Sequence, residues 1–89
     1  MRKLKYLEKI IKGFSNHRRI QIMDLLSQRP DLSIFEIADV LKVNFKTVSE
    51  HVRRLAISGI VVKRNDGSSV RHMLSRTGKS ILMFLRTLE

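Results

Sequence analysis

Apolar residues recur every three or four positions in five stretches of the chain, and this spacing places them together on one face of an α-helix. The first stretch covers residues 3–12 and ends at Gly13, a residue that commonly terminates helices. The apolar side chains of this first helix occupy two sides, with Leu4, Leu7 and Ile11 on one and Tyr6 and Ile10 on the other.

The next two stretches carry clear start and stop signals. The second begins at Ser15 or Asn16, which are both good N-caps, and ends before Pro30. In the third, Ser33 and Glu36 fit the S-x-x-E pattern of a capping box, in which each side chain satisfies an amide of the first turn. The apolar positions after this cap fit a helix without a break: Ile34, Ile37, Ala38 and Leu41.

A very short connection leads to the fourth helical stretch, residues 44–58, which Asn44 is placed to cap. Two short helices joined by so tight a turn are typical of the helix-turn-helix arrangement. The apolar face of this fourth helix consists of Val48, Val52 and Leu55, and its opposite face of Lys46, Ser49, Glu50 and Arg53.

The pattern then changes from helix to strand. The runs "IVVKRN" and "VRHMLS" are rich in β-branched or apolar residues and are separated by "DGSS", which predicts a β-hairpin over residues 60–75. A last helix is predicted over residues 77–89, where Ile81, Phe84, Leu85 and Leu88 have helical spacing. Leu82 and Met83 extend this apolar stripe. The sequence therefore predicts one domain over residues 1–89, mainly α with a small β-hairpin (α+β), in the order of four helices, hairpin and a last helix.

The formal net charge of +10 indicates a polyanionic partner, with nucleic acid favoured over an anionic membrane surface. The excess is concentrated in residues 42–79, which contain nine Lys and Arg residues against two acids. The polar face of the fourth helix can enter the major groove of DNA, and the basic hairpin can follow the backbone or an adjacent minor groove. A simple solvated face is the alternative interpretation of these charges.

Several other functions find no support in the sequence. The chain has no cysteine, which excludes disulfides and thiolate metal sites, and no apolar run long enough to cross a bilayer. It also contains no nucleophile–base constellation and no Gly-rich phosphate loop, so we expect no enzymatic activity and no cofactor. We expect a cytoplasmic, nucleoid-associated protein that does not bind membranes.

The sequence resembles the winged helix-turn-helix domain of ArsR-type transcriptional regulators and their archaeal relatives. The resemblance covers residues 14–75 and is carried by "HRRIQIMDLL", by "SIFEIADVLKVNFKTVSEHVRRL" and by "SGIVVKRNDGSSVRHMLS". It implies a homodimer that binds double-stranded DNA, with residues 44–58 as the recognition helix and residues 60–75 as the wing. It also implies that the first and last helices, within residues 1–13 and 77–89, form the dimer interface.

Two sets of residues follow from the pattern and the resemblance together. The residues expected to contact DNA are Asn44, Lys46, Thr47, Ser49, Glu50, Arg53 and Arg54 on the helix and Lys63, Arg64, Ser68 and Arg71 on the wing. Those expected at the dimer interface are Leu4, Tyr6, Leu7, Ile10, Ile11, Leu82, Met83 and Leu85, although they could instead complete the core of one chain.

The sequence departs from the family pattern at the metal sites. Metal-sensing members of the family carry thiolates at the start of the third helix, or Asp and His ligands on the last helix, and this chain has neither. No metal site is therefore expected, and the well-separated His17 and His72 lack ligand spacing. Phe45 also departs from the small or polar residue that many relatives have there, and it either packs inward or touches a thymine methyl group.

Four further residues carry open alternatives. His51 is expected to be half-buried rather than to contact DNA. Glu50 either takes part in base readout, directly or through Arg53 or Arg54, or forms a simple ion pair within the helix. Arg18 and Arg19 either contact phosphate or brace the domain.

The sequence thus predicts a dimeric, sequence-selective DNA-binding transcriptional regulator that acts as a repressor. An architectural DNA-coating protein with little sequence preference is one alternative. A winged-helix interaction module in a larger assembly is the other.

Overall fold

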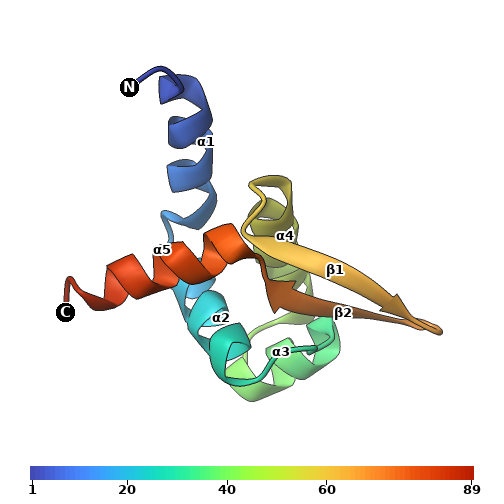
Figure 1. The fold of residues 1–89 in the computed structure, drawn as a ribbon. Coiled ribbons are helices and arrows are strands. Elements are labelled where there is room, and N and C mark those ends of the chain that lie inside the picture. Colours follow the sequence, from blue (N-terminus) through green and yellow to red (C-terminus); the bar gives the residue numbers. More distant parts are fainter.

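The computed structural model describes all of residues 1–89 and contains five helices and one two-stranded hairpin (Figure 1). In chain order the elements are α1 (Leu4–Phe14), α2 (His17–Gln28), α3 (Ile34–Leu41), α4 (Phe45–Ile57), β1 (Val61–Asp66), β2 (Ser69–Leu74) and α5 (Arg76–Arg86). The predicted order of elements and the mainly α character with a small hairpin are confirmed. None of the helices is both long and apolar enough to cross a membrane.

The hydrophobic core is formed around α2, which lies in contact with α4, α5 and β2. Burial of apolar side chains is the main force that holds so small a fold together. Thirteen buried hydrophobic residues form one cluster: Ile22, Met23, Leu25, Leu26, Leu32, Ile37, Val48, Val52, Leu55, Ile60, Val61, Leu74 and Leu82. Every element except α1 contributes at least one residue to this cluster, and α1 packs against it through Ile10 and Phe14.

The turn between α3 and α4 is fixed by backbone geometry and by side-chain caps. Lys42 adopts a left-handed conformation with φ of 56°, which ends α3. The side chain of Asn44 then accepts hydrogen bonds from the amides of Lys46 at 2.8 Å and Thr47 at 3.4 Å, which starts α4. At the other end of α3, the capping box between Ser33 and Glu36 forms as the sequence predicts.

The hairpin is antiparallel, with Val61 opposite Leu74 and Asp66 opposite Ser69, and its turn contains Gly67 at φ of 62°. The sequence pattern did not indicate a further short pairing, between Leu32 and His72. Through this pairing the amide of His72 donates to the carbonyl of Leu32, which joins the segment before α3 to the edge of β2. The wing is therefore attached to the helix-turn-helix by backbone hydrogen bonds as well as by packing.

The structure corrects two interpretations of the sequence. Gly13 does not terminate α1, because the helix continues to Phe14 and Gly13 is buried within it. A side chain at Gly13 would collide with Ser58, so glycine is required there by close packing against the end of α4. Leu82, which we assigned to the dimer interface, is only 4% exposed and belongs to the core of its own chain.

The two terminal helices extend away from the hairpin. In Figure 1 the wing projects to the right of the central helices, whereas α1 projects upward and the free end of α5 to the left. This arrangement leaves apolar side chains of α1 and α5 open to solvent, among them Leu4, Tyr6, Ile11, Met83 and Phe84.

Candidate nucleic-acid interface

The outward face of α4 consists of polar and basic side chains. Asn44, Lys46, Thr47, Glu50, Arg53 and Arg54 are exposed and Ser49 is half-buried. On the opposite face Val48, Val52 and Leu55 are at most 1% exposed, so the predicted division of this helix into two faces is confirmed. The first amides of the helix have no carbonyl of a preceding turn to which they could donate a hydrogen bond. Amides in this position attract anions.

Glu50 lies at the centre of this face and binds two arginines of the same helix. Its carboxylate accepts hydrogen bonds from Arg53 at 2.7 and 3.0 Å and from Arg54 at 3.1 Å. The hydrogen bonds from Arg53 and then from Arg54 lower the pKa of the Glu50 carboxyl to about 2, so it is ionised at neutral pH. The intrahelical ion pair, one of the two alternatives for Glu50, is therefore present, and it holds the guanidinium of Arg53 in a two-point contact.

His51 is half-buried, as the sequence predicts, and its ring contacts Arg19 of α2. Its Nδ1 atom accepts a hydrogen bond from Nε of Arg19 at 3.2 Å, which requires a neutral imidazole. Burial, followed by the positive charge of Arg19, lowers the pKa of His51. Arg19 also donates to the carbonyls of Lys12 and Gly13 at the end of α1, so it braces three helices, which is one of the two alternatives for this residue.

The wing arginines are partly occupied by acids that lie before and within α3. Arg71 donates to Oε1 of Glu36 at 2.5 Å and to the carbonyl of Asp31 at 3.2 Å. Arg64, opposite Arg71 in the hairpin register, lies 3.3 Å from Oδ2 of Asp31. Hydrogen bonds from Ser33 lower the pKa of the Glu36 carboxyl, and Arg71 lowers it further, so this ion pair persists at neutral pH.

These pairings distinguish two kinds of residue among those predicted on the wing. Lys63 and Ser68 are exposed and make no side-chain hydrogen bond or ion pair within the chain. Arg64 and Arg71 instead tie the hairpin to the start of α3. No local pattern indicates these ties, because the partners are separated by more than 30 positions in the chain.

An exposed aromatic pair lies where α3 and α4 begin. The rings of Phe35 and Phe45 are stacked, with centroids 4.4 Å apart and planes inclined by 20°. Phe45 is 41% exposed and Phe35 is 71% exposed, so Phe45 does not pack fully inward. Phe35 was not among the residues that the sequence indicated, because it lies on a helix predicted to be structural.

The start of α3 connects the wing to the start of α4. Glu36 binds Arg71 of the wing, and the adjacent Phe35 stacks on Phe45 at the first position of α4. The wing, the start of α3 and the start of α4 are thus held together by direct contacts. A ligand that lies along the start of α4 can reach the wing without crossing the core.

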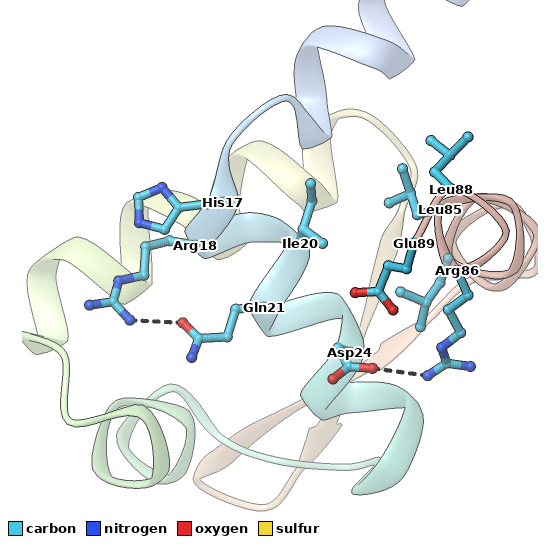
Figure 2. A pocket seen from close by; sticks show the side chains of 10 residues that line it. His17, Arg18, Ile20, Gln21, Asp24, Leu85, Arg86, Leu88 and Glu89 are labelled. Carbon is cyan, nitrogen blue, oxygen red and sulfur yellow. Dashed lines mark hydrogen bonds and ion pairs between the residues drawn. The ribbon is translucent and has the colours of Figure 1, made fainter.

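Two open clefts lie away from these residues. One, between α2 and α5, has a volume of about 710 Å³ and is shown in Figure 2. Its charged side chains are largely paired within the chain, since Arg18 donates to Gln21 at 2.8 Å and Arg86 to Asp24 at 2.9 Å. The other, a groove of about 360 Å³ between α1 and α5, is almost entirely apolar and is lined by Leu7, Ile10, Ile11, Phe14, Thr77, Ser80, Ile81 and Phe84.

Comparison with known proteins places this geometry in a family. The model of the arsR family of bacterial regulatory proteins matches residues 16–63, more than half of the chain. An uncharacterized HTH-type transcriptional regulator of Methanocaldococcus jannaschii is 32% identical over 68 residues, which cover 76% of this chain and 76% of that protein.

Solved structures share the fold over nearly the whole chain. HlyU from Vibrio cholerae is 28% identical with a TM-score of 0.84 and covers 99% of this chain and 97% of its own. A homodimeric winged helix-turn-helix DNA-binding domain from Mycobacterium bovis has a TM-score of 0.87 at 24% identity. The matched region covers 96% of this chain and 79% of that domain's chain. The fold is therefore the predicted winged helix-turn-helix, and the chain belongs to the arsR family of bacterial regulatory proteins.

Proposed function

We propose that the protein is a homodimeric transcriptional regulator that binds double-stranded DNA with sequence preference and represses transcription by occupying promoter DNA. The observation that supports this most is the contact path from α4 through the start of α3 to the wing. This path joins α4, with exposed Lys46, Thr47 and Arg53, to a hairpin that carries exposed Lys63, in a chain with a net charge of +10. Such a surface fits a major groove and its flanking phosphates.

Each proposed DNA contact has a distinct role. Lys46 and Thr47 lie on the first turn of α4, where an exposed ammonium and an exposed hydroxyl can meet phosphates and base edges together. Arg53, held by Glu50, presents a planar fork of donors that suits the O6 and N7 acceptors of guanine. Lys63 and Ser68 on the wing contact the backbone, where charge contributes affinity without sequence information.

The apolar side chains of α1 and α5 support the proposal of a dimer. Leu4, Tyr6, Ile11, Met83, Phe84 and Leu88 are each more than half exposed. Two of them, Ile11 and Phe84, line the apolar groove between α1 and α5, and exposed apolar surface of this kind often marks a protein–protein contact. The related M. bovis domain is described as homodimeric, and we infer the same assembly here through these two helices.

A two-fold dimer would place two recognition helices against one face of the duplex. If they enter successive major grooves, the two half-sites are separated by about 34 Å, or roughly 10 base pairs. The preferred site should therefore be an inverted repeat with that spacing.

The proposal is tested by selecting bound duplexes from random DNA and titrating the selected and a shuffled duplex at two salt concentrations. The selected duplex should bind at least about a thousandfold more tightly than the shuffled one. Equal affinity would contradict a sequence-selective regulator and favour a DNA-coating protein. No binding at low salt would leave only an interaction module. Repression is checked by adding the protein to an in vitro transcription reaction on a promoter that contains the selected site.

A further inference from the structure

We propose that the Phe35–Phe45 stack is an apolar reading element that recognises the C5-methyl group of thymine in the major groove, with Phe45 in contact with the methyl and Phe35 supporting it. This inference rests on the proposed function, because it names a base feature that the recognition surface would read. It decides between the two alternatives that the sequence leaves open for Phe45, and it adds Phe35, to which neither the family match nor the polar pattern of α4 assigns a role.

The position of the pair is the first step in the argument. Phe45 is the first residue of α4 and follows the capping Asn44, whereas Phe35 is the second residue of α3 and follows the capping box at Ser33. Side chains in a helix lean toward its N-terminus, so both rings are directed past the starts of their helices. The positive end of the α4 dipole favours an anionic neighbour such as the DNA backbone.

Exposure is the second step. Phe35 is the most exposed aromatic residue of the chain at 71%, and Phe45 remains 41% exposed although the two rings are stacked at 4.4 Å. Neither ring belongs to the buried core cluster. Two exposed aromatic rings outside the core, held at the starts of two helices, indicate a surface that binds a partner rather than one that stabilises the fold.

The chemistry of the surroundings selects the occupant. The rings are bordered by exposed Lys46 and Thr47 on α4, and the nearby wing carries exposed Lys63. A purely apolar partner surface would leave these cations without counter-charges. A major groove instead offers phosphates at its edges and, on its floor, one apolar group only, the thymine methyl.

The stack gives the two rings different tasks. Phe45 lies on the helix that would enter the groove, so its ring is the one that reaches a base. Phe35 restricts the rotamers of Phe45 through the ring contact and covers the ring face that the DNA does not reach. We therefore expect Phe45 to determine the preference for thymine and Phe35 to strengthen it.

Replacement of thymine by deoxyuridine tests this directly, because it removes only the C5-methyl group. Each thymine of the selected site is replaced in turn, symmetrically in both half-sites, and the affinity of the wild-type protein is measured. At one position the loss should be about fourfold per methyl, or about 15-fold for the symmetric pair. At that position Phe45→Ala should bind the thymine and deoxyuridine duplexes equally, and Phe35→Ala should show a reduced ratio.

Lys46→Ala is the matched control, since it lies beside Phe45 and should weaken binding to both duplexes while the ratio stays as in the wild type. Thermal unfolding of each variant verifies that it is folded. The inference is overturned if the preferred site contains no thymine, if no thymine shows a deoxyuridine penalty, or if Phe45→Ala keeps the penalty. In these cases a strong preference for the selected over the shuffled duplex would still support the proposed function, whereas loss of that preference would contradict both.

Discussion

Gly13 of α1 packs directly against the side chain of Ser58 at the end of α4. A β-carbon placed on Gly13 would lie 2.4 Å from Cβ of Ser58 and 2.1 Å from its Oγ. Ordinary contacts between carbon atoms are about 3.5–4.0 Å, so any side chain here forces the two helices apart. This contact fixes the distance between a helix of the proposed dimer interface and the recognition helix.

Gly13→Ala should therefore destabilise the protein, although alanine is the better helix former. Overpacking costs about 1–3 kcal/mol, which exceeds the roughly 1 kcal/mol gained in helix propensity. Thermal unfolding should show a decrease in Tm of several degrees. The second-site change Ser58→Gly should restore Tm because it removes the opposing Cβ, whereas Ser58→Ala should not. Equal Tm values for the two double variants would contradict this account.

On the recognition helix, we predict that Arg53→Ala relaxes base preference as well as weakening binding. Loss of a bidentate contact to guanine costs about 1–3 kcal/mol of discrimination against other bases. Glu50→Gln should have a similar but smaller effect, because the amide retains the shape of the carboxylate and loses the charge that fixes Arg53. Both are checked by competition between the selected duplex and single-base variants. If Arg53→Ala weakened all duplexes by the same factor, Arg53 would be a phosphate contact.

Two basic residues of the wing should behave differently. Lys63→Ala should weaken all duplexes alike, reduce the dependence of log K on log salt by about one unit and leave Tm unchanged. Arg71→Ala should lower Tm by several degrees, because it removes the ties to Glu36 and to the carbonyl of Asp31. We would measure the salt dependence of DNA binding and the Tm of thermal unfolding for both variants and compare them with the wild type. A change in base preference for Lys63→Ala would show that the wing reads sequence.

Phe84→Glu should dissociate the proposed dimer. Phe84 is 58% exposed and lines the apolar groove between α1 and α5, so a carboxylate there would be desolvated in an interface. Lys79→Glu serves as the control, since Lys79 is also exposed on α5 but does not line the groove. Sedimentation equilibrium should give twice the mass of one chain for the wild type and for the control, and the mass of one chain for Phe84→Glu. A monomeric wild type would refute the dimer itself.

Acidification should destabilise the protein before its carboxylates titrate. Burial lowers the pKa of His72 and of His51 from the ordinary value of 6.5, so the unfolded chain binds protons that the folded chain excludes. The corresponding stability is present above pH 6.5 and is lost as the pH falls below that value. Tm should decrease between pH 7.5 and 5.5, and His72→Asn should be less stable at neutral pH but show a smaller decrease. Identical pH profiles would argue against a contribution from His72.

Local signals in the sequence predicted the helices and their boundaries well. The capping box at Ser33 and the cap at Asn44 act within three residues, so their consequences do not depend on the rest of the fold. The two faces of α4 were likewise predictable, because helical periodicity alone separates Val48, Val52 and Leu55 from the polar positions.

Features that depend on distant contacts were not predictable in the same way. The position of Gly13 after an apolar stretch predicts a helix stop, whereas the approach of Ser58 is decided by tertiary packing. Leu82 and Met83 are adjacent on α5, and only the packing of the helix determines that the first is buried and the second exposed. The pairing of Leu32 with His72 involves too few residues to produce a periodic signal.

The connection between α3 and α4 has a consequence for the DNA. Lys42 in its left-handed conformation, the cap at Asn44 and the stacked phenylalanines leave this pair of helices little freedom to adjust their mutual angle. Any misfit with the duplex must then be absorbed by bending or twisting of the nucleic acid. Operators with easily kinked pyrimidine–purine steps should be favoured, even at base pairs that no side chain reaches.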